Sequence, residues 1–456
     1  MKKISTPTDM TVGTPWKSIL SFTLPMLIGN IAQQLYSTVD SIVVGRYIGD
    51  NALAAVGSAM PLINMLLVLF IGISSGTGIM VSQYFGAKNR EKLSKTIGNS
   101  ITLTAFACVL LMAIALPFIR PILNMLNTPK SIIDWCADYL TISLVGVAGM
   151  AYYNILSGII RGMGDSFSAL MYLLVATVIN IVLDIFFVAK LGMGVGGVAL
   201  ATVIAQLVSS VFCLVKLSRM QEEFDFSVKY LRPIGSYIKT TIRLGLPTGL
   251  TQAIFSSAMI IVQSLTNCFG ELFIAANVVI MRVDGFAMMP NFSFGMALTT
   301  YAGQNVGAGL YDRVTKGAKQ GTLMAVICSA SITTLILFFG KYLMGIFTQT
   351  TELVDTSNYL MRILAAGYIA VAVTQSLSGI MRGAGDTMTP MWISLITTVV
   401  ARVPIAYGIS YLTRTASLPY GRCECIQISL LVSWVLGALL TVIFYKRGKW
   451  KNKRLK

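Results

Sequence analysis

The amino-acid sequence predicts an all-α integral membrane protein with twelve transmembrane helices in two six-helix lobes, related by a pseudo-twofold axis along the membrane normal. Three observations lead to this prediction. The composition is too apolar for a water-soluble fold, long apolar runs recur at lengths that span a bilayer, and the second half of the sequence repeats the first.

The composition predicts that most of the chain is surrounded by lipid and not by water. Hydrophobic residues make up 55% of its 456 residues and charged residues 12%, and the mean hydropathy is +0.74. Soluble domains carry about 25% charged residues, so this chain cannot bury its apolar surface in one aqueous core. Barrel strands would give short alternating segments, whereas these runs reach the ~20 residues that a transmembrane helix needs. The polar start and the long first run do not match a cleavable signal peptide.

Twelve apolar runs are predicted to cross the membrane. In order, they cover residues 17–44, 52–82, 95–117, 134–156, 167–189, 195–217, 241–265, 273–302, 318–340, 357–380, 388–411 and 426–445. If the N-terminus is inside, 25 of the 35 Lys and Arg residues lie in or beside inner segments and only 7 in outer loops. Basic residues are enriched in cytoplasmic loops. We therefore expect a multi-pass protein of the cell membrane with both termini cytoplasmic.

The net charge of +17 is explained by this topology and by attraction to anionic lipid head groups. Membrane lipids are thus expected partners, and nucleic acid is not.

An internal repeat divides the chain into two halves. At an offset of 221 residues, SGIIRGMGDS (157–166) matches SGIMRGAGDT (378–387), and SQYFGAKN (82–89) matches GQNVGAGL (303–310). Because each half has an even number of spans, both enter the membrane in the same direction, which gives the axis along the normal and a cleft between the lobes. The predicted division is an N-terminal lobe (1–218), a cytoplasmic connector (219–240) and a C-terminal lobe with a basic tail (241–456).

Only three of the 18 acidic residues, Asp40, Asp184 and Asp284, lie well inside apolar runs. An acid at the centre of a transmembrane helix costs roughly 2.5–3.5 kcal/mol on insertion scales, so each is a candidate functional residue. The alternative is that each makes an interhelical hydrogen bond and nothing more.

Four polar residues are predicted to form one site in the outer half of the first lobe. Asp40 and Asp184 lie near the far ends of the first and fifth runs, Asn180 is one helical turn before Asp184, and Thr202 is about two turns into the sixth run. Two carboxylates, an amide oxygen and a hydroxyl suit either a hard cation or a shared proton. H⁺ or Na⁺ is therefore the expected ion, and no other metal or cofactor is expected.

Several motifs together make the chain similar to a known family. They are the R-G-x-G-D loops after the fourth and tenth runs, the Gln-x-x-Gly-Ala signatures after the second and eighth, and the prolines in the first and seventh. In this order, and over nearly the whole chain, they resemble the multidrug and toxic compound extrusion (MATE) family.

The resemblance implies a secondary antiporter that exchanges H⁺ or Na⁺ for bulky amphiphilic, often cationic compounds by alternating access. It implies a prokaryotic branch in which positions matching Asp40, Asn180, Asp184 and Thr202 form the cation site, and in which the proline matching Pro25 lets the first helix bend. A static kink at Pro25 is the alternative. We expect a monomer.

The second lobe departs from the first. Arg402 lies one residue from Ala401, the position that matches Asn180, so no cation site is expected there. Arg402 either neutralises acid in the cleft or has a structural role. Asp284, with Met281 and Met288 on the same helix, is the main candidate for substrate contact because thioethers adapt to varied shapes. Simple packing of the methionines is the alternative.

Secondary polar candidates for substrate contact are Gln34, Tyr36 and Asn154.

Enzyme functions are excluded by what the sequence lacks. It contains no histidine for a Ser–His mechanism and no Walker A motif for ATP binding. Cys423 and Cys425 could bind metal or form a bridge, or could be two unpaired thiols. Two other functions stay open: a lipid-linked oligosaccharide flippase of the same wider superfamily, which would need a cleft rich in Arg and Lys, and a channel or receptor.

Overall fold

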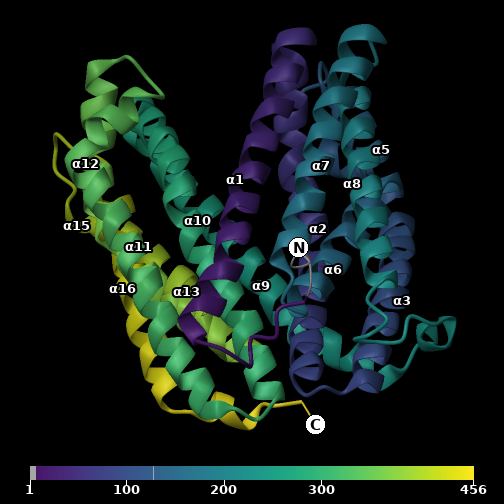
Figure 1. The fold of residues 1–456 in the computed structure, drawn as a ribbon. Helices are drawn as coiled ribbons and strands as arrows, with labels where there is room; N and C mark the ends of the chain where they lie inside the picture. Colours follow the sequence, from purple (N-terminus) through teal and green to yellow (C-terminus); the bar gives the residue numbers. More distant parts are fainter. Residues whose placement is uncertain (1–6, 127, 456) are drawn as a thin grey trace. The chain divides into compact units, whose positions relative to one another are not determined.

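The structure, a computed structural model, describes residues 7–126 and 128–455, without the side chains of Tyr36, Ser37, Ser41 and Asp50. This part of the chain is almost entirely helical (Figure 1). Nine of its helices are long and apolar enough to cross a bilayer, and two more spans are pairs of helices that meet at a bend. With α1 (Pro15–Tyr47), each of the twelve predicted runs falls on one helix or on one interrupted helix.

The helices of the first half are α1, α2 (Asp50–Gly86), α3 (Arg90–Ala115), η1 (Leu116–Phe118), α4 (Ile119–Met125), α5 (Ile133–Val145), α6 (Val147–Gly162), α7 (Ser166–Asp184), η2 (Ile185–Lys190) and α8 (Gly194–Ser218). After η3 (Val228–Leu231), those of the second half are α9 (Gly235–Thr266), η4 (Asn267–Phe269), α10 (Glu271–Gly307), α11 (Tyr311–Gly345), α12 (Thr351–Ala365), α13 (Gly367–Gly383), α14 (Met388–Leu395), η5 (Ile396–Ala401), α15 (Arg402–Leu412), α16 (Cys425–Lys446) and η6 (Lys449–Asn452).

The fourth and tenth spans are bent where the sequence predicted continuous helices. The axes of α5 and α6 differ by 50°, and those of α12 and α13 by 46°. A glycine at each bend gives room to a neighbouring helix: a Cβ on Gly146 would lie 2.3 Å from the side chain of Val203, and one on Gly367 would lie 2.5 Å from Trp434. The fifth and eleventh spans contain π-helical turns, η2 and η5, which were also not predicted.

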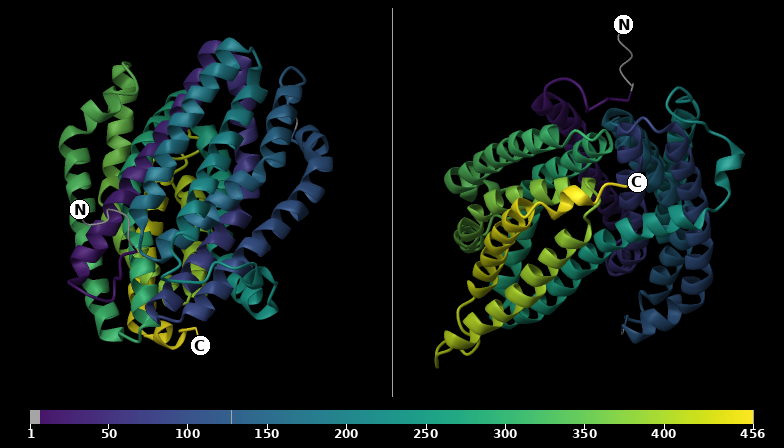
Figure 2. Two further views of the ribbon diagram at one scale, coloured as in Figure 1. Left: turned by 45° about the vertical axis from the view of Figure 1, so that its right-hand side comes forward. Right: turned by 90° about the horizontal axis from the view of Figure 1, so that it is seen from below.

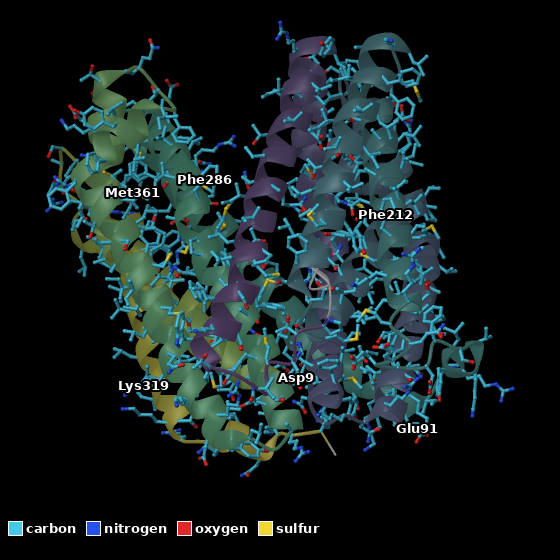
Figure 3. The ribbon with its side chains drawn as sticks, viewed as in Figure 1. Asp9, Glu91, Phe212, Phe286, Lys319 and Met361 are labelled. Carbon is cyan, nitrogen blue, oxygen red and sulfur yellow. The ribbon has the colours of Figure 1, made fainter. Side chains whose placement is uncertain are left out.

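Large apolar side chains are exposed along the spans. Phe338 is 77% exposed and Met65 is 76% exposed. Phe212 on α8 and Phe286 on α10 are also exposed, and Figure 3 labels both. So many exposed apolar groups are typical of a surface that faces lipid rather than water.

The repeated R-G-x-G-D motif ends one helix and begins the next. Its second glycine takes a positive φ, +90° at Gly164 and +99° at Gly385, which favours glycine. The aspartate that follows then caps the next helix. Asp165 Oδ1 accepts from the Ser168 backbone N–H at 2.9 Å, and Asp386 Oδ1 accepts from Thr389 N–H at 3.3 Å.

The glycines before the turn allow close helix packing. A Cβ on Gly379 of α13 would lie 2.3 Å from Gly295 O of α10, and one on Gly383 would lie 2.2 Å from Thr299 O. The matching glycine of α6, Gly162, would place a Cβ 2.9 Å from Gly78 O of α2. Small residues four apart let membrane helices approach until their backbones touch. The motif is therefore explained by packing and capping.

The contacts divide the chain into two compact units, and the division falls inside two helices. The first unit contains Leu24–Gly249, and the second contains Met10–Thr23 and everything from Leu250 onward. The sequence had assigned α1 and α9 each to one lobe. Within each unit the helices run side by side, as the views in Figure 2 also show.

The first part of α1 belongs to the second unit and the first part of α9 to the first unit, and hydrogen bonds fix both. In the second unit, Met10 N–H donates to Gln304 Oε1 at 2.8 Å, and Arg313 donates to Val12 O at 2.6 Å. In the first unit, Ile234 N–H, just before α9, donates to Asn99 Oδ1 at 2.6 Å.

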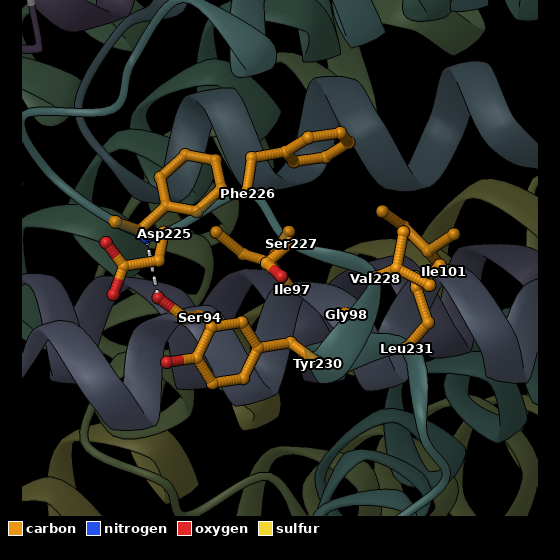
Figure 4. Close-up of a pocket in the computed structure, with 11 residues that line it drawn as sticks. Ser94, Ile97, Gly98, Ile101, Asp225, Phe226, Ser227, Val228, Tyr230 and Leu231 are labelled. Atoms are coloured by element: carbon orange, nitrogen blue, oxygen red, sulfur yellow. Dashed lines mark hydrogen bonds between the residues drawn. The ribbon is translucent and has the colours of Figure 1, made fainter.

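The connector between the halves lies against α3 (Figure 4). Asp225 N–H donates to Ser94 Oγ at 2.8 Å, and Arg90 forms an ion pair with the Asp225 carboxylate at 2.7 Å. A largely apolar cavity of about 110 Å³ lies between them. It is lined by Ser94, Ile97, Gly98, Ile101, Phe224, Asp225, Phe226, Ser227, Val228, Tyr230 and Leu231. None of the predicted site residues lines this cavity.

Candidate functional site

Two carboxyl groups meet inside the first unit. Asp40 on α1 is 4% exposed, and Asp184, the last residue of α7, is fully buried. The two side chains interact directly with each other, and both carboxyl groups lie within hydrogen-bonding distance of the Asn180 amide. Two carboxylates offer only acceptors and repel each other unless a proton or another cation lies between them. The arrangement fits a bound proton or another cation.

Asn180 bridges the two acids from one turn earlier on α7. When its amide nitrogen faces them, it donates to Asp40 Oδ1 at 2.9 Å and to Asp184 Oδ2 at 3.2 Å. The other terminal atom of the amide lies 3.4 Å from the Thr202 hydroxyl of α8. The opposite orientation would place the amide oxygen beside both carboxyl groups, where only a cation could satisfy three acceptors. The four residues are therefore adjacent.

Two further features belong to this cluster. Asp184 Oδ1 is buried and has no hydrogen-bond partner among the described residues, so one acceptor is left for an ion. Tyr139 of α5 is buried and interacts electrostatically with both Asp40 and Asp184. Sequence reasoning missed Tyr139. A tyrosine in an apolar run is common, and only its place beside two acids distinguishes it.

The donor set suits a hard cation or a proton. It consists of carboxylate, amide and hydroxyl oxygens, which are ligands for ions such as Na⁺. In the described part of the chain, no group of three or more His, Cys, Asp or Glu side chains could hold a metal ion.

The other polar residues predicted in the first lobe lie outside this cluster. Asn154 of α6 donates from its amide to Met150 O of its own helix at 2.8 Å. Gln34 of α1 is half-buried, and its backbone carbonyl accepts from Thr38 Oγ1 at 2.9 Å. The side chain of Tyr36 lies outside the described residues. Pro25 lies inside α1, next to the residue at which this helix passes to the first unit.

The second unit contains a separate charged cluster. Tyr368 of α13 donates its hydroxyl to Asp284 Oδ1 of α10 at 2.9 Å. Arg402, the first residue of α15, interacts electrostatically with Asp284 and is 9% exposed. Met288 belongs to the buried hydrophobic core around these residues, whereas Met281 is 44% exposed. The two predicted methionines thus have different surroundings.

Cys423 and Cys425 are both free thiols. Burial, chiefly, raises the pKa of the Cys423 thiol above its usual value, and the nearby Glu424 carboxylate adds to this effect. A thiol with a raised pKa is a poor metal ligand and a poor nucleophile.

Comparisons with known proteins agree with the repeat and with the fold. The MatE family model matches residues 25–186 and again residues 247–408. The probable multidrug resistance protein YoeA of Bacillus subtilis is 30% identical over 453 residues, covering 96% of this chain and 95% of that protein. The probable multidrug resistance protein NorM of Thermotoga maritima is 25% identical over 449 residues, covering 96% and 93%.

Among solved structures, an outward-facing multidrug resistance MATE family transporter of the MOP superfamily matches with a TM-score of 0.90. The two are 23% identical, and the match covers 98% of each chain.

Proposed function

The chain belongs to the MATE family of multidrug transporters, and we propose that it is a secondary antiporter that exports amphiphilic, often cationic compounds in exchange for H⁺ or Na⁺. The observation that carries this proposal is the adjacent pair of buried acids, Asp40 and Asp184, which share the Asn180 amide. Burying an ionisable acid inside a membrane span is energetically unfavourable, so such an acid usually has a function, such as binding an ion.

The proposed cycle is alternating access. With the termini cytoplasmic, as the distribution of basic residues favours, the acid pair lies in the outer half of the first lobe. A cation that enters from outside binds Asp40 and Asp184, reshapes α1, α7 and α8, and releases the drug. The lobes then rock inward, the cation leaves and drug binds. The inward gradient supplies about 2.3 kcal/mol per charge for each 100 mV.

We assign Pro25 the role of a hinge in α1. Leu24 is the first residue of α1 that belongs to the first unit, so Pro25 lies where this helix changes partners. A proline removes one helical hydrogen bond, which makes bending at this point less costly.

The substrate contact in the second lobe is assigned to Asp284. Its carboxylate accepts one hydrogen bond from Tyr368 and lies in a mostly apolar environment. A cationic amphiphile could place its charge beside this acid and its apolar part against neighbouring side chains such as Met281.

The proposal is tested by collapsing the gradients separately in inside-out vesicles that contain the purified protein. We expect drug efflux to stop when one of the two gradients is removed and to continue when the other is removed. The gradient whose removal stops efflux identifies the coupling ion. Efflux that persists after both gradients are collapsed would refute antiport.

Asn180→Ala is expected to slow gradient-driven efflux by about 10- to 100-fold. The substitution removes hydrogen bonds to charged groups, each worth about 1.5–3 kcal/mol, and every 1.4 kcal/mol is about tenfold in affinity. Thr177→Val, on the same helix, is the matched control because the Thr177 hydroxyl donates to Leu173 O of its own helix. The measurement is efflux rate against cation concentration. An unchanged cation dependence in Asn180→Ala would contradict its role.

A further inference from the structure

The connector between the halves contains a short apolar segment that is only partly buried. Residues 224–231 read FDFSVKYL, within a stretch otherwise rich in charged residues. Phe224 is buried, whereas Phe226 is 42% exposed and Val228 is 80% exposed. The segment lies at the edge of the first unit, beside α3 (Figures 1 and 2). Exposed apolar side chains next to charged ones are typical of a surface that contacts a membrane or a partner.

The apolar cavity described above lies between this segment and α3. Ile97 and Ile101 line it from α3, and Val228 and Leu231 line it from the connector (Figure 4). Both isoleucines belong to the apolar run that is predicted to cross the membrane from residue 95 onward. The cavity therefore lies where α3 enters the hydrocarbon layer. An apolar cavity of roughly 150 Å³ holds a benzene ring, so this one, of about 110 Å³, has room for a few methylene groups.

Positive charge gathers beside the cavity. Glu91, at the start of α3, interacts electrostatically with three lysines, which are Lys92, Lys95 and Lys229. In the described part of the chain, only Lys95 lies within ion-pair distance of the Glu91 carboxylate. Three lysines around one acid leave an excess of positive charge. Lys229 is exposed, and both of its neighbours in the sequence line the cavity, so an anionic group is favoured at the cavity edge.

We propose that the connector and the start of α3 form a binding site for an anionic phospholipid of the cytoplasmic leaflet. Part of an acyl chain occupies the cavity, Phe226 and Val228 contact the surrounding lipid, and the phosphate lies beside Lys229. With the termini cytoplasmic, as the distribution of basic residues favours, the connector lies at the leaflet that carries anionic lipids. Apolar side chains that enter the interface, with basic residues next to them, are the features of interfacial lipid binding. The inference does not depend on the proposed antiport.

Quenching by brominated lipids tests this assignment. Val228→Trp places a fluorescent reporter at an exposed position of the site, and the signal of the wild-type tryptophans is subtracted. The full-length variant is reconstituted in phosphatidylcholine vesicles with a rising fraction of brominated phosphatidylglycerol or brominated phosphatidylcholine. We expect half-maximal quenching at a fraction of phosphatidylglycerol at least about fivefold lower than that of phosphatidylcholine. Adding Lys229→Gln should reduce this preference by roughly fivefold, the effect of one basic residue near an anionic surface.

Two further variants complete the test. Lys319→Gln in the Val228→Trp protein is the matched control, because Lys319 is an exposed lysine near the corresponding end of α11 in the second unit, and the lipid preference should be unchanged. Ile101→Phe adds bulk to the cavity and should weaken quenching by both lipids alike.

Equal quenching by the two lipids in Val228→Trp would overturn the proposal, and so would a preference that Lys229→Gln leaves unchanged. Quenching that Ile101→Phe does not weaken would contradict an acyl chain in the cavity. The assay uses no drug and no ion gradient, so its failure would not be confused with a failure of antiport.

Discussion

Asp184→Asn is expected to abolish drug resistance and gradient-driven efflux while leaving a folded protein. Asparagine has nearly the shape of aspartate, and it can still hydrogen-bond Asp40 and Asn180, but it cannot bind and release a cation. Because coupling needs a site whose charge is neutralised in each cycle, we expect gradient-driven efflux to fall to the level of vesicles without the protein. Efflux in vesicles and thermal unfolding of the purified variant are the two measurements.

Asp134→Asn is the matched control for this variant. Asp134 lies in the same unit, its side chain is 70% exposed, and it pairs with Arg120 at the surface. Exposed pairs contribute little, so efflux should be unchanged. If Asp184→Asn instead lowered stability and kept its efflux, the acid would be an interhelical hydrogen-bonding group and nothing more.

Gly383→Leu is expected to prevent stable assembly of the second unit. A Cβ at this position would lie 2.2 Å from Thr299 O and 2.9 Å from Gly303 N, which are backbone atoms of α10 that cannot turn away. Overpacking usually costs about 1–3 kcal/mol where side chains can adjust, so we expect at least about 3 kcal/mol here. The yield of monodisperse protein and its thermal unfolding measure the effect.

Leucine substitutions at two other glycines serve as comparisons for this prediction. Gly162→Leu, the equivalent in the first unit, should be damaging but less so, since its Cβ would lie 2.9 Å from Gly78 O. Gly408→Leu should be tolerated, because nothing lies within 4 Å of a Cβ there. Equal yields for all three variants would contradict the account of the repeated motif as a close helix contact.

The twelve spans could be predicted from the sequence because hydrocarbon thickness fixes the length of an apolar run. The bends at Gly146 and Gly367 and the π-helical turns η2 and η5 could not. The bends depend on which side chain of a neighbouring helix, Val203 or Trp434, lies against the glycine, and a local sequence pattern does not contain this information.

The division of α1 and α9 between two units was missed for a similar reason. Hydropathy shows that a segment crosses the membrane, but it does not show which helices the segment contacts. Here the contacts of Met10 with Gln304 and of Ile234 with Asn99 depend on residues far away in the sequence.

Most of the acid cluster could be predicted, because helical periodicity places Asn180 beside Asp184, and depth in the membrane brings Asp40 and Thr202 to the same level. Tyr139 could not be singled out, since tyrosines are common in spans. In the second unit, the sequence identified Asp284 and Arg402 separately. Their proximity, and the role of Tyr368 between helices α10 and α13, came only from the structure.

The most direct test of the central claim is the affinity of the purified protein for a cationic dye, measured across a range of pH and of Na⁺ concentration. Coupling between two sites is reciprocal, so a cation that drives drug release must weaken drug binding. We predict that the wild-type protein binds the dye less tightly as the coupling cation is added, and that Asp184→Asn binds it equally well at every pH and Na⁺ concentration. An Asp184→Asn protein that keeps the wild-type dependence would contradict the account.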